Sequence, residues 1–122
     1  MKEETAQLDL KVRTKRFAVR ILKFANSLPT SLGGTTVAKQ IVRSGTSVAA
    51  NYRAACRARS KKEFLAKLGM AEEECDETLF WIESAVDEGR VSSSKVAALA
   101  TEASELLAIL VSSIKTARRN LP

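Results

Sequence analysis

The sequence contains no histidine and only two cysteines among its 122 residues. The absence of histidine removes the commonest general base and the Glu-x-x-His ligand pairs of carboxylate-bridged iron bundles. Two cysteines alone cannot form a zinc site. Because Cys56 and Cys75 each fall within an apolar helical pattern, we expect two reduced, packed thiols. These absences favour a protein that is not an enzyme and holds no metal or other cofactor.

Proline, glycine, aromatic residues and long apolar runs are also scarce. Two prolines and five glycines leave few interruptions to helical structure, and aromatic residues make up 5% of the chain. The longest apolar run, Leu106 to Val111, is far shorter than the roughly 20 residues that cross a bilayer, so we expect no membrane partner. Met1 to Arg20 is polar and amphipathic, unlike a signal peptide, which favours a cytoplasmic protein.

Helical periodicity is what the sequence does contain. Apolar residues recur at three- and four-residue spacing and predict helices over about 6–28, 36–58, 61–88 and 93–118. Thr30 to Thr36, with Gly33-Gly34, has the composition of a loop, so Thr35 or Thr36 should cap the second helix.

The remaining connections are marked by local signals. Ser60 and Glu63 have the spacing of a capping box, Gly89 is suited to a left-handed helix stop, and one of Ser92, Ser93 or Ser94 should cap the last helix. Four amphipathic helices with short connections predict one all-α domain over residues 1–122, an up-down-up-down four-helix bundle.

Charge is distributed unevenly along the chain. Residues 1–67 carry 15 Lys/Arg and 4 Asp/Glu, a balance of +11, whereas residues 68–122 carry 5 and 10, a balance of −5. Clustered cations can neutralise the phosphates of RNA or DNA, a contact that salt weakens. Because few aromatics are available to stack on bases, we expect contacts mainly with the backbone. The candidate nucleic-acid-binding residues are Arg13, Arg16, Arg20, Lys23, Arg57, Arg59, Lys61 and Lys62.

Two alternatives remain open. The basic helices can instead pair with the acidic third helix, within or between subunits, in which case the protein is a scaffold or accessory subunit for a protein partner. Glu73 and Glu77 lie one helical turn apart and in principle can share a cation or act as an acid–base pair. Such carboxylates more often form a solvated face or a row of salt bridges.

The second predicted helix is crowded with small residues. Gly45 in its interior should cost roughly 1 kcal/mol, which a close approach of another helix would offset. A buried Arg43 would need an acceptor, and Glu74 or Glu77 on the facing helix can supply one. Phe80 and its neighbour Trp81 cannot both fill one core, which favours an oligomer. We predict structural or interface roles for Arg43, Ser44, Gly45, Ser47, Asn51, Tyr52, Glu74, Glu77 and Trp81.

The run from Arg43 to Tyr52 has the pattern Arg-Ser-x-x-Ser-Val-x-x-Asn-Tyr, and it is preceded by Leu28-Pro29 and followed by Glu73-Glu74. With these motifs the chain resembles the bacterial four helix bundle protein family, also known as proteins encoded by intervening sequences of large-subunit ribosomal RNA genes. The likeness covers roughly residues 14–119, with Ala54 where members commonly have Glu.

The resemblance implies an assembly more than an activity. Members look like small bundles that form rings of five, and a related accessory protein of diversity-generating retroelements is a basic pentameric barrel that engages a reverse transcriptase and nucleic acid. The family supplies no catalytic residue to transfer. We therefore expect a ring-shaped homo-oligomer, a pentamer, that acts by binding RNA or DNA or a protein partner.

Overall fold

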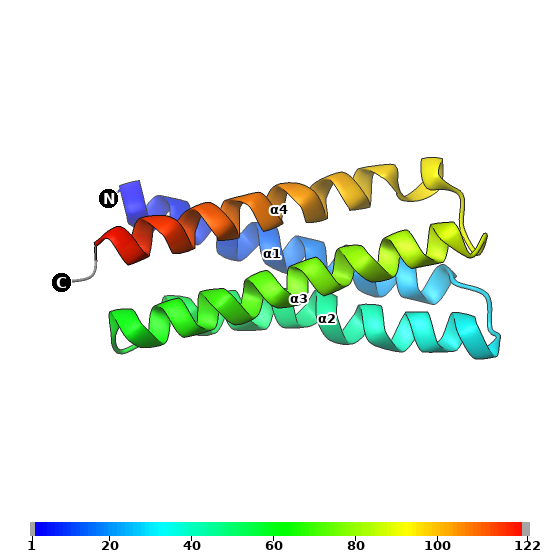
Figure 1. The fold of residues 1–122 in the computed structure, drawn as a ribbon, viewed down its shortest axis with the longest axis horizontal. Coiled ribbons are helices and arrows are strands. Elements are labelled where there is room, and N and C mark those ends of the chain that lie inside the picture. Colours follow the sequence, from blue (N-terminus) through cyan, green and yellow to red (C-terminus); the bar gives the residue numbers. More distant parts are fainter. Residues whose placement is uncertain (1, 121–122) are drawn as a thin grey trace.

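The computed structural model describes residues 2–120, with the side chains of residues 5, 7 and 9–120. These residues form four α-helices and no strand: α1 (Lys2–Ser27), α2 (Leu32–Cys56), α3 (Lys61–Asp87) and α4 (Ser93–Arg119). Consecutive helices run antiparallel, side by side, up-down-up-down along one long axis (Figure 1). The prediction of an all-α four-helix bundle is confirmed, and the ring-shaped oligomer stays a prediction.

The ends of α3 follow the local signals in the sequence. Ser60 caps its start, because the Ser60 Oγ accepts from the Glu63 amide at 3.1 Å. The Glu63 carboxylate reaches back to the amide of Arg59 at 3.1 Å, one residue earlier than in the standard capping box. At the other end Gly89 has φ +76°, and the Arg90 amide donates to Ala85 O at 3.0 Å. This is a Schellman stop, for which glycine is preferred.

The start of α2 differs from the prediction. The helix begins at Leu32 rather than near Thr36, and its N-cap is Ser31 rather than Thr35 or Thr36, since the Ser31 Oγ accepts from the Gly34 amide at 3.0 Å. Gly33-Gly34 therefore lies in the first helical turn. A Cβ on Gly34 would stand 2.1 Å from the Pro29 carbonyl oxygen, so the glycine is needed for close backbone packing and does not mark a loop.

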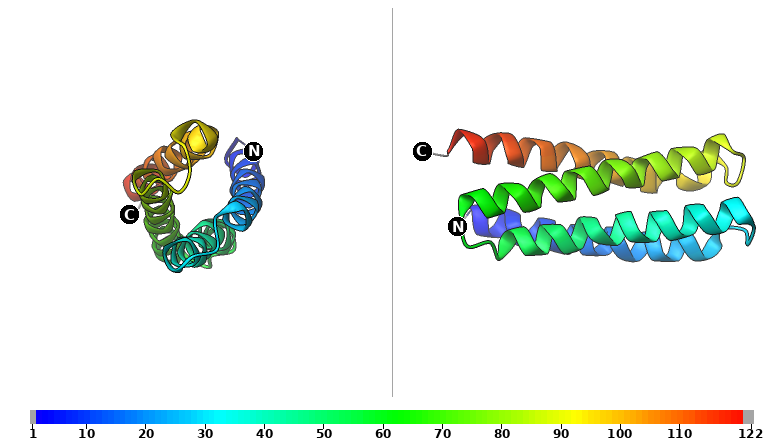
Figure 2. Two further views of the ribbon diagram at one scale, coloured as in Figure 1. Left: turned by 90° about the vertical axis from the view of Figure 1, so that its right-hand side faces the viewer. Right: turned by 60° about the horizontal axis from the view of Figure 1, so that its bottom comes forward.

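The four apolar stripes meet in one core, but the helices do not enclose it evenly. Each helix contributes fully buried side chains, among them Phe17, Ile41, Leu68 and Leu106. α2 packs extensively on α1 and α3, and α3 on α4, whereas α1 and α4 touch at few residues. The view along the bundle shows the helices following one another around an arc, with α1 and α4 at its two ends (Figure 2).

The small residues of α2 allow its neighbours to come close. A Cβ built on Gly45 would lie 2.7 Å from Ile21 Cγ2 of α1. On the side of α3, the Thr78 hydroxyl donates to the Ser44 Oγ at 2.9 Å, and both residues are fully buried. The predicted structural roles of Ser44 and Gly45 agree with these contacts.

The end of the bundle opposite the chain termini is joined by one arginine. Arg90, from the α3–α4 loop, donates through Nη1 to the Ser31 Oγ at 2.9 Å and through Nε to Glu88 at 2.9 Å. Its guanidinium also covers Gly33, where a Cβ would be 1.9 Å from Nη2. The two loops at this end are therefore held together.

α4 is, within the described residues, the one helix long and apolar enough to cross a membrane by length and composition. The core helices of soluble bundles share that property, and seven residues of α4 between Val96 and Ala117 are buried in the bundle. The expected absence of a membrane partner stays a prediction.

Two helical glycines in different surroundings give a matched test of the packing. Gly45→Ala should lower the free energy of unfolding, because overpacking against the β-branched Ile21 costs about 1–3 kcal/mol, more than the roughly 1 kcal/mol that alanine gains in a helix. Gly69→Ala meets no atom within 4 Å and should stabilise the protein. Urea unfolding followed by circular dichroism measures both, and a Gly45→Ala protein as stable as the parent would contradict the packing argument.

Candidate nucleic-acid interface

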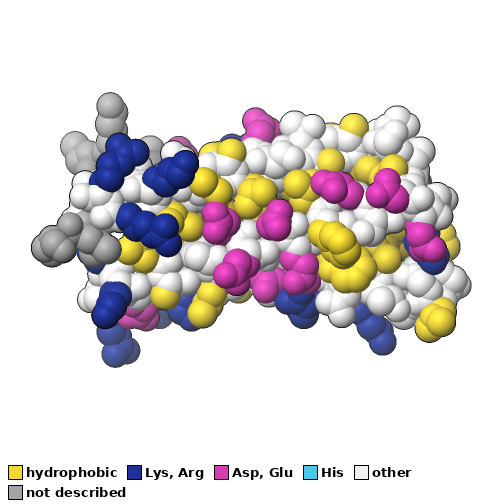
Figure 3. Space-filling view, in the orientation of Figure 1, with side chains coloured by type: hydrophobic (Ala, Val, Ile, Leu, Met, Phe, Trp, Pro, Cys, Tyr) yellow, Lys and Arg dark blue, Asp and Glu magenta, His cyan; other side chains and the backbone are white. Residues whose placement is uncertain are grey.

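One end of the bundle collects cations from two distant parts of the chain. The α2–α3 junction and the last turns of α4 lie together there, because α2 and α4 run in the same direction (Figure 1). Lys and Arg side chains gather over this end, while Asp and Glu side chains lie over the middle of the same face (Figure 3). We call this the cationic end and define it by Arg57, Arg59, Lys61, Lys62, Lys115, Arg118 and Arg119.

All seven side chains of the cationic end are exposed. None forms an ion pair with a carboxylate that the structure describes. Two described acids lie nearby: Glu63, whose carboxylate is bound to the Arg59 amide, and Asp9, on α1. The end therefore carries an excess of uncompensated positive charge on short elements that the bundle holds in place.

The other predicted group of cations lies along α1, and one of them, Arg13, is already paired with a carboxylate. Arg13 donates to both carboxylate oxygens of Glu102 on α4, at 2.8 and 2.6 Å, and lies 3.5 Å from Glu105. The hydrogen bond from Arg13, and then its charge and that of Arg20, hold the pKa of Glu102 below its usual range against the opposing effect of burial. Arg13 thus holds α1 to α4.

Arg16, Arg20 and Lys23 are exposed. Among the side chains that the structure describes, they have no ion-pair partner. They lie in the second half of α1, away from the cationic end, and the charge of Arg20 helps to lower the pKa of Glu102 on α4. The structure therefore separates the eight predicted cations into two surfaces.

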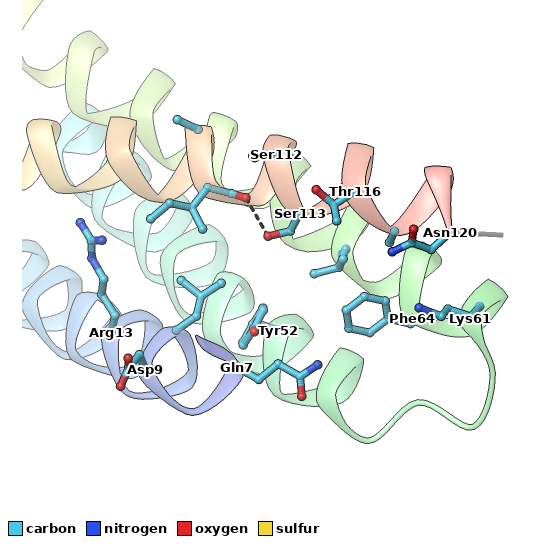
Figure 4. Close-up of a pocket in the computed structure, with 15 residues that line it drawn as sticks. Gln7, Asp9, Arg13, Tyr52, Lys61, Phe64, Ser112, Ser113, Thr116 and Asn120 are labelled. Carbon is cyan, nitrogen blue, oxygen red and sulfur yellow. Dashed lines mark hydrogen bonds between the residues drawn. The ribbon is translucent and has the colours of Figure 1, made fainter. Parts of the chain in front are cut away.

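A cavity opens beside the cationic end, between α1 and α4. Its volume is about 710 Å³. Gln7, Asp9 and Arg13 of α1 stand on one side, and the last turns of α4, from Ala108 to Asn120, stand on the other (Figure 4). Tyr52 of α2 and Phe64 of α3 lie between them, and Lys61 is at the mouth. We call this the end cavity.

The end cavity combines an apolar interior with polar groups at its edge, of which Asp9, Arg13 and Lys61 are charged and the others uncharged. Leu10, Phe64, Leu68 and Ile109 supply apolar surface. The Ser113 hydroxyl donates to the Ile109 carbonyl at 2.8 Å, whereas the exposed side chains of Ser112, Thr116 and Asn120 make no hydrogen bond to any described residue. Pockets of this size and composition are typical of small-molecule sites.

Tyr52 forms a buried part of the lining, with 3% of its surface exposed. Burial, and then the neighbouring Cys56, raises the pKa of its hydroxyl far above the ordinary value. The phenol is therefore neutral at physiological pH and serves as a packed wall of the cavity.

A polar network across α2 and α3 accounts for several predicted structural residues. Arg43 is exposed and binds Glu74 at 2.9 Å and also Glu77. The Trp81 Nε1 donates to the same Glu77 carboxylate at 3.3 Å. The expected pairing of Arg43 with Glu74 or Glu77 is present, and it involves both acids.

Asn51 and Ser47 contact one another within α2. The Asn51 Nδ2 donates to the Ser47 carbonyl one turn earlier in α2, at 2.9 Å. Neither side chain contacts the carboxylates of Glu74 and Glu77 on α3, which are bound by Arg43. Their predicted interface role concerns an assembly and stays a prediction.

Phe80 and Trp81 behave differently from one another, as their adjacency predicted. Trp81 is half-buried at the edge of the core, whereas Phe80 is 55% exposed. The two rings make an edge-to-face contact with centroids 5.0 Å apart. Other large apolar side chains are exposed on α1, namely Val12, Val19 and Leu22.

The carboxylates and thiols offer little chemistry in the described part of the molecule. No group of three or more Cys, Asp or Glu side chains there could hold a metal ion. Glu77 is bound by Arg43, and Glu73 is exposed. Cys75 is buried and donates to the Ala103 carbonyl at 3.3 Å, and burial raises the pKa of its thiol to about 12. Cys56 is a half-buried free thiol.

Three residues of the cationic end were not predicted from the sequence as candidate binding residues. Lys115, Arg118 and Arg119 belong to residues 68–122, which carry a net negative charge. Comparing the net charges of the two halves of the chain therefore does not reveal these three cations. The antiparallel topology could have identified them, because the fourth helix of such a bundle ends beside the connection between the second and third helices. Phe64, which lines the end cavity, was also not predicted as a site residue.

Comparisons with known proteins point to one family. A family model described as 23S rRNA-intervening sequence protein matches residues 6–112. A crystal structure of a protein of unknown function from the S23 ribosomal protein family of Bacteroides thetaiotaomicron is similar, with a TM-score of 0.83 and 32% identity. That match covers 89% of this chain and 97% of the other. No curated protein matches the sequence.

The Arg13–Glu102 contact predicts a pH-dependent contribution to stability. Because the folded-state pKa of Glu102 is lowered, the contribution is present above the ordinary carboxyl pKa of about 4.3 and is lost as the pH falls through the lowered value. Glu102→Gln should therefore destabilise the protein at neutral pH, and the difference from the parent should shrink at acid pH. Urea unfolding at a series of pH values measures this.

Glu105→Gln is the control for that experiment. Glu105 lies at the longer distance from Arg13 and is more exposed, so its replacement should change stability less at neutral pH. A Glu102→Gln protein whose loss of stability stays constant from neutral to acid pH would show that the ion pair contributes nothing to folding.

Proposed function

The chain belongs to the 23S rRNA-intervening sequence protein family, and on this premise we propose that it is a nucleic-acid-binding protein without enzymatic activity. It holds the phosphate backbone of RNA or DNA at the cationic end. The observation that carries the proposal is the convergence of seven exposed cations, from two segments far apart in sequence, with no described carboxylate paired to any of them.

The chemistry of these cations suits a polyanion. Four of them are arginines, whose planar guanidinium groups can donate two hydrogen bonds to the oxygens of one phosphate: Arg57, Arg59, Arg118 and Arg119. The lysines add point charges on flexible side chains. Neutralising phosphates releases condensed counterions, so binding of this kind is strong at low salt and independent of sequence. The family description refers to 23S rRNA, which makes RNA the first polyanion to test.

Assembly into a ring is the second part of the proposal. α4 turns a face of small, exposed residues outward, which permits close packing of another helix: Ala97, Thr101 and Ser104. The exposed Phe80 and the apolar side chains on the outside of α1 also suit contact with a second copy. In a closed ring, such as a pentamer, symmetry places every cationic end on the same side, so one strand can contact several copies and gain avidity.

A second candidate is a protein-interaction scaffold. The exposed Phe80 ring, packed edge-on against Trp81, is the observation that favours it, because aromatic residues are enriched at protein interfaces. A tagged protein that recovers one partner from nuclease-treated extract, and loses it on Phe80→Ala, would support this function. Recovery of nucleic acid with no protein partner would count against it.

The nucleic-acid proposal predicts a specific loss on removal of charge. The triple variant Lys61→Gln, Lys62→Gln and Arg118→Gln should bind generic single-stranded RNA at least tenfold more weakly at low salt, because three phosphate contacts are removed. The slope of log affinity against log salt should fall in magnitude by about 2, since each contact contributes about 0.7. Fluorescence anisotropy over a series of salt concentrations measures both.

The matched control removes the same charge elsewhere. Lys15→Gln, Lys39→Gln and Lys95→Gln are three exposed positions outside the cationic end and should leave the salt slope nearly unchanged. A third variant, Arg16→Gln, Arg20→Gln and Lys23→Gln, tests the α1 surface in the same way. Equal losses in all three would indicate an effect of net charge alone, and no RNA or DNA binding by the parent at low salt would end the proposal.

A further inference from the structure

We infer that the end cavity accepts one unpaired nucleobase of a strand whose phosphates lie on the cationic end, so that the protein prefers single-stranded over base-paired nucleic acid. This inference rests on the proposed function and extends it from the backbone to a base.

The position of the cavity is the first step. Lys61 belongs to the cationic end and also lies at the cavity mouth, next to Phe64 and Asn120 (Figure 4). Asn120 directly follows Arg118 and Arg119 in sequence. A phosphate bound by Lys61 therefore lies at the opening, and the attached base can point either into solvent or into the cavity.

The lining of the cavity fits a planar heteroaromatic ring. Phe64 presents an aromatic ring in the cavity, with Leu68 and Ile109 as further apolar wall. Stacking of a base on an aromatic side chain is favourable and tolerates every base, because each has a π-face. At about 710 Å³ the cavity falls within the range of small-molecule pockets, about 300–1,000 Å³, and so can hold one base.

The polar groups at the mouth point to the same class of ligand. The side chains of Ser112, Thr116 and Asn120 are uncharged and make no hydrogen bond to any described residue. Hydroxyl and amide groups can both donate to and accept from the edge of a base. A lipid or other long apolar molecule would leave these groups unused, and a free anion would not use the apolar walls.

The same geometry excludes a base that remains paired. A base inside a duplex is stacked on both faces and bonded along its edge, so it must be unstacked and unpaired before it can enter a cavity, at a cost of a few kcal/mol. A single strand already has its bases free. The cationic end alone would not make this distinction, because it recognises phosphates.

The test compares strands that differ only in bases. The parent protein should bind a single strand of uridine nucleotides at least tenfold more tightly than an abasic strand of the same length and charge. Phe64→Leu keeps an apolar side chain but removes the aromatic face, and Ser112→Trp should fill the cavity from α4. Both should reduce the affinity for the uridine strand to that for the abasic strand, with the salt slope unchanged.

Ala98→Trp is the control for the added indole, since Ala98 is exposed at the opposite end of α4 and lies outside the face proposed for contact between copies, and it should bind like the parent. Urea unfolding of each variant shows that it is folded. If the parent binds uridine and abasic strands equally while the cationic-end variant weakens both, the cavity takes no base and the proposed backbone contact still stands. If the parent binds neither strand at low salt, the proposed function and this inference fall together.

Discussion

The close approach of α1 and α3 to the small-residue side of α2 determines the shape of the bundle. Gly45 leaves room for Ile21 on one side, and Ser44 meets Thr78 on the other. Because α2 is packed tightly on both flanks, the helices follow an arc, and α4 packs on α3 with few contacts to α1. The seam between α1 and α4 is therefore the least tightly packed helix–helix contact of the bundle, and the end cavity lies in it.

Positive charge has two different roles along this frame. In the middle of the molecule arginines hold helices together, as Arg13 does with Glu102 and Arg43 with Glu74. At the cationic end no described acid takes that role, and the side chains stay in solvent. A concentrated positive field at one end of a molecule attracts a polyanion over distances of about a Debye length.

The sequence was sufficient for the helices and for signals that act within a few residues. Apolar periodicity predicted four helices. Ser60 and Gly89 begin and end α3 where expected, because each acts on its own neighbouring amides and carbonyls. The predicted start of α2 was wrong, because Gly33-Gly34 was taken to mark a loop, whereas Gly34 is required by close contact with the Pro29 carbonyl. That contact is set by the path of the chain, which no local pattern specifies.

The candidate site was harder to predict from the sequence than the helices were. Arg57 to Lys62 stood out as a run, but the cations of α4 join them only through the antiparallel arrangement. Arg13 looked equivalent to Arg16 and Arg20, and only the proximity of Glu102 distinguishes it. The end cavity depends on the spacing between α1 and α4, which hydrophobic periodicity leaves undetermined.

Arg90 adds a mechanical consequence. Because Arg90 joins the two loops at the far end of the bundle, any widening of the α1–α4 seam must pivot there. The displacement is then greatest at the opposite end, at the cavity mouth beside Lys61.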